Sequence, residues 1–151
     1  MNKRDIIIKI RYARAAHMKW KSYAQIAIGG LITESSHQNI PIVQTEGEFG
    51  KWYYGDGMAL SMMPSYISIE EPLENVYSIY LQIYTLQRAK HKGGFFGFFR
   101  NDEKKRLKEI ELLTANFNSY NKILLDSVHQ LEMEVMNLSE MEFLQMVNLI
   151  G

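Results

Sequence analysis

The sequence predicts an all-α fold, an antiparallel four-helix bundle with a long connection between its first and second helices. Apolar side chains recur every three or four residues over long segments that lack glycine and proline. Two S-x-x-E capping boxes also mark helix starts, and no segment of any length alternates as a β-strand does. We divide the chain into a bundle over residues 1–137 and a short C-terminal helix or tail over residues 138–151.

The first helix is predicted over residues 4–28, where neither glycine nor proline occurs. Spacings of three and four residues place one set of side chains on a single helical face. That face consists of Ile6, Ile10, Ala13, His17, Trp20, Ala24 and Ile28. Gly29-Gly30 is a plausible stop signal, and the mixed composition of residues 31–47 predicts a long connection.

A second element is expected around residues 48–63, where Gly55-Asp56-Gly57 divides it into two short pieces. The capping box that begins at Ser68 and the proline that follows it predict a third helix, which runs to about Lys90. Its apolar face consists of Val76, Tyr77, Ile79, Tyr80, Ile83, Tyr84 and Leu86.

Residues 93–99 are predicted to form a glycine- and phenylalanine-rich loop, after which Asn101 or Asp102 can cap the last long helix. The buried stripe predicted for this helix is Leu107, Ile110, Leu113, Phe117, Tyr120, Leu124, Val128, Leu131 and Val135. A capping box at Ser139 predicts that a short terminal helix begins there.

Composition excludes several classes of protein. The 151 residues include no cysteine, which rules out disulfide scaffolds and any thiolate-based metal or nucleophilic site. A content of 46% hydrophobic and 12% aromatic residues rules out wholesale disorder. No apolar run approaches the roughly 20 residues that span a bilayer, and the N-terminus has no secretory signal pattern. We therefore expect a cytoplasmic protein.

The charges balance at 17 basic and 17 acidic residues, but they are unevenly distributed. Residues 1–23 and 88–108 are strongly basic, whereas the chain from residue 109 onward carries seven acids and only Lys122. These runs are interpreted either as solvated helix faces or as docking sites for an anionic partner or membrane surface. No recognition motif for nucleic acid accompanies them.

His17 is unusual because an ionisable ring lies on an otherwise apolar stripe, three residues before Trp20. It is either a core histidine with one hydrogen bond or a metal ligand. A metal site needs three or four converging donors, and the other histidines, at 37, 91 and 129, offer no helical ligand pair on a face expected to be buried.

Three short motifs occur in order along the chain: His17-Met-Lys-Trp20, Glu48-Phe-Gly50-Lys-Trp52 and Leu73-Glu-Asn-Val-Tyr77. In order and spacing they resemble the chemoreceptor zinc-binding (CZB) domain, whose pattern is a His before a Trp, then Cys-x-x-Gly-x-Trp, then His-x-x-x-His. There are 30 residues between the first two motifs' leading residues and 24 between the next two. Residues 113–125 also resemble the last helix of that family. The resemblance implies a cytoplasmic four-helix bundle of bacterial signal transduction.

Three of the four zinc ligands of the CZB pattern are absent. Glu48 stands at the cysteine position, and Leu73 and Tyr77 stand at the paired histidine positions, so only His17 remains. Leucine cannot ligate a metal, although a carboxylate can. We therefore expect neither a zinc cofactor nor cysteine-based oxidant sensing.

The vacated centre needs other contacts, because an unpaired buried histidine or carboxylate is costly. One hypothesis is that Glu48 accepts a hydrogen bond from His17, with the Tyr77 hydroxyl nearby and Leu73 filling the apolar remainder. The alternative is that Glu48 faces solvent while His17 bonds a backbone carbonyl. Trp20, Gly50 and Trp52 are interpreted as packing residues. The alternative interpretation is that aromatic side chains form a pocket for a small molecule.

The predicted loop at 93–99 offers a second candidate site. It contains Phe95, Phe96, Phe98 and Phe99, followed by Arg100, and lysines flank it on both sides. These side chains either dock on a partner or membrane surface or fold back over the end of the bundle.

No phosphate-binding loop and no catalytic constellation can be nominated, so we expect no enzyme and no catalytic residues. The expected function is that of a stand-alone, zinc-independent signalling or adaptor module. It is expected to form a homodimer and to bind a signalling protein such as a chemoreceptor or a diguanylate cyclase. The alternatives are a sensor that binds a metal or small molecule through His17 and Glu48, and a binder of membranes or anionic partners through the Phe-rich loop.

Overall fold

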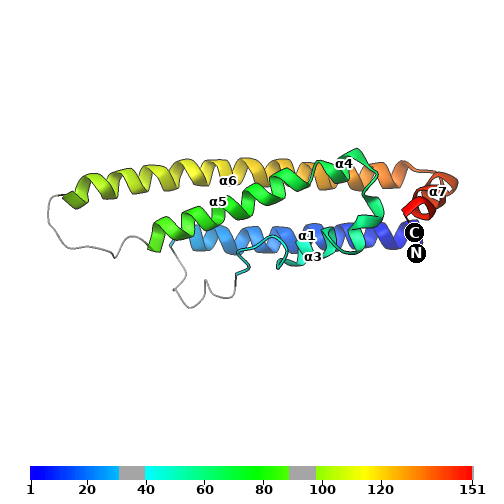
Figure 1. Ribbon diagram of the computed structural model, residues 1–151, viewed down its shortest axis with the longest axis horizontal. Coiled ribbons are helices and arrows are strands. Elements are labelled where there is room, and N and C mark those ends of the chain that lie inside the picture. The colour runs from blue at the N-terminus through cyan, green and yellow to red at the C-terminus, as the bar shows by residue number, and fades with distance from the viewer. Residues whose placement is uncertain (31–39, 89–97, 151) are drawn as a thin grey trace.

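A computed structural model describes residues 1–30, 40–88 and 98–150, with the side chains of residues 98–101 excepted. Within these ranges the chain is helical and has no strand (Figure 1). Three long helices form the frame of the molecule: α1 (Lys3–Ile28), α5 (Glu70–Arg88) and α6 (Phe98–Asn137). In Figure 1, α1 and α5 run in the same direction and α6 returns antiparallel to both. The all-α prediction is confirmed for the described residues.

Short elements connect the long helices. After α1 come α3 (Glu48–Tyr53), the 3₁₀ helix η1 (Asp56–Leu60) and α4 (Pro64–Ile67). The two-piece second element that Gly55-Asp56-Gly57 predicted is therefore confirmed as α3 and η1. At the other end of the chain, α7 (Glu140–Ile150) folds back from α6, so that both termini lie at the same end of the molecule (Figure 1).

The bounds of α1 follow from its capping residues. The Asn2 side chain accepts from the Asp5 backbone amide, and the Asp5 side chain accepts from the amide of Asn2, forming a capping box. At the other end, Gly30 takes the left-handed conformation with φ of 71°, which ends the helix. The predicted apolar face is confirmed at every position except Ile28, which is half-buried while the neighbouring Ala27 is buried.

The start of α5 differs from the prediction. Ser68 ends α4, and its hydroxyl donates to the Ser65 carbonyl at 2.8 Å, so it does not cap the following helix. The helix begins at Glu70, and Pro72 lies in its first turn, where a missing amide costs no hydrogen bond. The apolar face is buried as predicted from Val76 to Ile83, and the exposure of Tyr84 and Leu86 is intermediate.

The start of α6 also differs. The helix begins at Phe98, before the predicted caps, because no proline or glycine after Gly97 prevents another helical turn. Figure 1 shows this first part of α6 extending beyond the ends of α1 and α5. Leu107, predicted to be buried, is 53% exposed because it lies about 80° around the helix from Phe117, whereas Phe117, Leu124, Val128, Leu131 and Val135 are buried as predicted.

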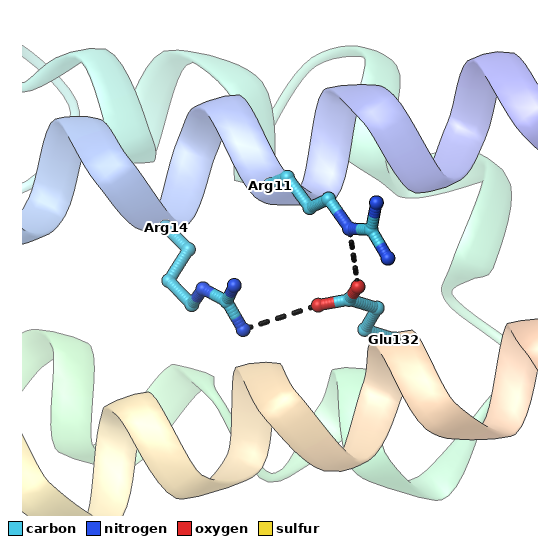
Figure 2. A network of polar contacts seen from close by, with 3 residues as sticks. All are labelled: Arg11, Arg14 and Glu132. Carbon is cyan, nitrogen blue, oxygen red and sulfur yellow. Dashed lines mark hydrogen bonds and ion pairs between the residues drawn. The ribbon is translucent and has the colours of Figure 1, made fainter.

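A polar contact ties α1 to α6 inside this apolar frame. Glu132 on α6 is buried, and its two carboxylate oxygens accept from Arg11 Nε at 2.5 Å and from Arg14 Nη1 at 3.1 Å (Figure 2). The two arginines are one helical turn apart on α1, which allows both to reach the same carboxylate.

The end of the molecule that holds both termini is fastened by local and long-range contacts. The Ser139–Glu142 capping box is confirmed: the Ser139 backbone amide donates to the Glu142 carboxylate, and the Glu142 backbone amide donates to the Ser139 hydroxyl. Lys3 Nζ donates to the Leu138 carbonyl at 2.6 Å, and Phe143 of α7 is buried in the core. No helix within the described ranges combines the length and apolar character that crossing a bilayer requires.

Candidate functional site

The candidate site is a cavity of about 210 Å³ between α1, α3, α5 and the segment from Ile40 to Gly47. Three of the four positions that the CZB resemblance singles out line it: His17, Glu48 and Tyr77. The fourth, Leu73, lies one helical turn before Tyr77 on α5 and is fully buried. The remaining wall is formed by Ala16, Lys19, Trp20, Tyr23, Ile40, Pro41, Gly47 and Phe49.

His17 is 1% exposed, and its Nε2 lies 2.8 Å from Asn121 Oδ1 on α6. The amide nitrogen of Asn121 donates to the Phe117 carbonyl at 2.9 Å, which leaves only the oxygen to face the ring. Because an amide oxygen can only accept, His17 Nε2 donates, and in the neutral ring Nδ1 carries the lone pair. Nδ1 has no hydrogen-bond partner, alone among the buried side-chain nitrogen and oxygen atoms of the described residues.

Burial lowers the pKa of His17 to about 4, because a charged imidazolium would lose its hydration. The hydrogen bond to Asn121 raises the pKa and the nearby charge of Lys21 lowers it, and both effects are smaller than that of burial. The ring is therefore neutral at pH 7.

The proposed hydrogen bond between His17 and Glu48 is wrong. Glu48 is the first residue of α3, its side chain is 74% exposed, and it pairs with Lys51 one turn later at 2.9 Å. The exposed carboxylate keeps its hydration and a local partner, both of which burial beside a neutral histidine would remove. The alternative is correct in placing Glu48 toward solvent, but His17 bonds a side-chain amide and not a backbone carbonyl.

Trp20 and Tyr77 form the aromatic wall of the cavity. Their rings stack with centroids 4.1 Å apart, and Trp20 Nε1 donates to the Pro41 carbonyl at 2.9 Å. This bond holds the segment from Ile40 to Gly47 against α1. Burial raises the pKa of Tyr77, so its hydroxyl stays protonated, and no residue in the described ranges hydrogen-bonds to it.

Gly47 makes room for that hydroxyl, since a Cβ at this position would lie 2.2 Å from Tyr77 Oη. Gly50 permits a similar approach, because a Cβ there would lie 1.7 Å from the Gln44 backbone carbonyl oxygen. The close packing predicted for Gly50 thus involves the preceding segment and not another helix. Trp52 is half-buried and lies 5.5 Å from the Phe49 ring, which agrees with its predicted packing role.

The second candidate site can be located only in part. Phe95 and Phe96 lie outside the described residues, and the side chains of Phe98, Phe99 and Arg100 do as well. The backbone of the last three belongs to α6, so Phe98 and Phe99 are helical where a loop was predicted.

Asn121 and Glu132 were not among the site residues predicted from the sequence. Asn121 follows Phe117 by four residues and precedes Leu124 by three, which places it on the buried stripe of α6. Its position in that stripe was the available signal. For Glu132 the signal was the pair of arginines one turn apart on α1, although nothing local showed that they face it.

Within the described residues, no group of three or more histidine, aspartate or glutamate side chains converges in a way that could hold a metal ion. Among the residues that line the cavity, His17 is the only histidine and Glu48 the only carboxylate, and the free nitrogen of His17, Nδ1, is itself buried. Comparison of the chain with family models, with curated proteins and with solved structures finds no match.

Proposed function

We propose that this chain is a helical signalling module of the CZB type that works by binding other proteins and without zinc. The observation that carries the proposal is the convergence of His17, Glu48 and Tyr77 on one cavity, with Leu73 packed one turn from Tyr77. The motif resemblance expects these four positions around one centre. In this chain a buried His–Asn hydrogen bond and a Trp–Tyr stack occupy that neighbourhood.

On the same resemblance, we propose that the fold is an antiparallel four-helix bundle whose second helix is shortened to α3. In support, α3 packs along α1, while α5 and α1 both pack against the antiparallel α6. The signal would be transmitted as a change in helix packing, to a bacterial signalling protein such as a chemoreceptor or a diguanylate cyclase.

The outer face of α1 supports self-association. Opposite its buried stripe, the helix exposes Ile8 (39%) and Ile26 (43%), and its flank exposes Tyr12 (74%) and Tyr23 (48%). Ile8 and Ile26 are equally distant from His17 along the helix. An antiparallel pair of α1 helices crossing at that level therefore places Ile8 of one protomer against Ile26 of its partner. Such a contact is isologous and gives a closed dimer.

The homodimer is tested by multi-angle light scattering coupled to size-exclusion chromatography on the full chain. Tyr12→Glu should convert a dimer to a monomer, because a charge would be buried between the paired helices. The matched control is Leu112→Glu, which adds the same charge at a 67% exposed position on α6 and should leave the dimer intact. A monomeric natural chain, or equal behaviour of both variants, contradicts this interface.

Zinc independence is tested by elemental analysis of protein purified without chelator and then dialysed against zinc. We expect well below one zinc per chain and no change in thermal unfolding on zinc addition. Stoichiometric zinc that is lost in His17→Gln would overturn the proposal, because it would show that the histidine still anchors a metal.

A further inference from the structure

The cavity beside His17 has the features of a ligand site that protein–protein binding leaves unused. A volume of about 210 Å³ corresponds to roughly seven water molecules at about 30 Å³ each. Its walls are mostly aromatic, with the Trp20–Tyr77 stack and Phe49 among them. A space of this size and character suits one small flat molecule.

One polar group in the wall, the hydroxyl of Tyr77, has no hydrogen-bond partner among the described residues. Tyr77 is 2% exposed, and its hydroxyl fills the place that a Cβ of Gly47 would take. The unpartnered Nδ1 of His17 is itself buried. An unsatisfied phenol directed at a cavity is a hydrogen-bonding group available to a ligand.

The charges around the cavity favour an anion. Lys19 and Glu48 both line it, but the Glu48 carboxylate is already paired with Lys51. Lys19 makes no ion pair within the described residues and lies 6.0 Å from the Tyr23 ring centroid. The unneutralised charge on this wall is thus positive, and His17 adds none because it is neutral at pH 7.

We propose that this cavity binds a small aromatic carboxylate, with its ring against the Trp20–Tyr77 wall and its carboxylate near Lys19 and the Tyr77 hydroxyl. This ligand would be the signal that the module senses. The inference goes beyond the proposed function and does not depend on the homodimer, because the cavity is built within one chain.

The test is isothermal titration calorimetry of the full chain with two pairs of probes: phenylacetate with phenylacetamide, and indole-3-acetate with its amide. At least one acid should bind saturably and roughly tenfold more tightly than its neutral amide, the value of one good charged contact. Lys19→Gln should remove this preference for the acid. Lys122→Gln, which removes an equal charge on α6 away from the cavity, should retain it.

A second pair of variants distinguishes this cavity from any other binding surface. Ala16 lies on the rim and is half-buried, so Ala16→Phe should block the cavity without entering the core and should abolish binding. Met18→Phe adds an aromatic ring at a 51% exposed position outside the cavity and should bind as the natural chain does. Absence of binding for all four probes overturns the proposal, and so do equal affinities for acid and amide or binding that survives Ala16→Phe. Light scattering of the same variants reports their oligomeric state separately, so failure here is distinguishable from failure of the interface proposed on α1.

Discussion

At the scale of the residue, His17 illustrates how one polar group is accommodated in an apolar helix face. Its donor is satisfied by Asn121, while its acceptor is buried without a partner. An unpaired buried acceptor costs about 1–3 kcal/mol, and protonation would add the larger cost of a buried charge. The fold therefore holds this ring in a single neutral tautomer.

The first prediction concerns the pH dependence of stability. The folded pKa of about 4 lies below the ordinary value of 6.5, so the unfolded chain binds more protons between these values. The stabilisation is complete above pH 6.5 and is lost as the pH falls toward 4, by about 3 kcal/mol in total. Urea unfolding from pH 7 to pH 4.5 should show this loss.

Carboxylates also titrate near the acid end of that range, so matched variants are needed. His17→Gln should unfold with a much flatter pH dependence, whereas His129→Gln, at an exposed position on α6, should keep the slope of the natural chain. Equal slopes for the natural chain and His17→Gln would show that another group is responsible.

At the scale of the element, the pairing of α1 with α6 combines an apolar seam with one charged contact. Glu132 has a side chain only 6% exposed, whereas those of Arg11 and Arg14 are 54% and 32% exposed. The arginines can regain water if the carboxylate is removed, but the carboxylate cannot if the arginines are removed. The desolvation cost is therefore asymmetric between the partners.

The second prediction follows from this asymmetry. The Arg11→Met, Arg14→Met double variant strands a buried carboxylate and should lower the free energy of unfolding by about 3–5 kcal/mol. Glu132→Gln should cost less, about 1–2 kcal/mol, because its amide is neutral and the arginines are partly solvated. Lys122→Ala, which breaks an exposed pair with Asp126, should change stability by about 0.5 kcal/mol or less. Urea unfolding at pH 7 ranks the three, and a larger cost for Glu132→Gln than for the double variant would contradict the asymmetry.

At the scale of the whole molecule, the two chain ends are joined at one end of the helical frame. Lys3 bonds the Leu138 carbonyl, and α7 packs near η1 with Phe143 1% exposed. The short terminal helix is thus a part of the core, although its outer residues Met141, Leu144 and Leu149 remain exposed.

The third prediction tests this integration. Phe143→Ala should lower the free energy of unfolding by about 3–5 kcal/mol, because it leaves a cavity in the core. Leu149→Ala, at an 80% exposed position on the same helix, should change it by about 0.5 kcal/mol or less. Thermal and urea unfolding of both variants measure the difference, and similar costs would show that α7 is not packed as described.

The helices and most of their buried faces could be predicted from the amino-acid sequence, because both depend on local periodicity and capping. The stripe from Ile6 to Ala24 and the capping box at Ser139 were predicted correctly for this reason. Predictions failed where the result depends on which segments pack against one another in space. Ser68 ends α4 and does not open α5, and Leu107 is exposed although the adjacent Arg106 still bonds the Leu86 carbonyl of α5.

The candidate site shows the same division. The sequence singled out His17, Glu48 and Tyr77, and all three line one cavity. Their actual partners were decided by tertiary structure. Asn121 is 104 residues from His17, and Glu132 is 121 residues from Arg11, and neither separation leaves a local signal. Helices could be predicted from the sequence because helix formation depends on local periodicity and capping. The pairing of buried polar groups depends on which helix faces meet, and only the tertiary structure determines those contacts.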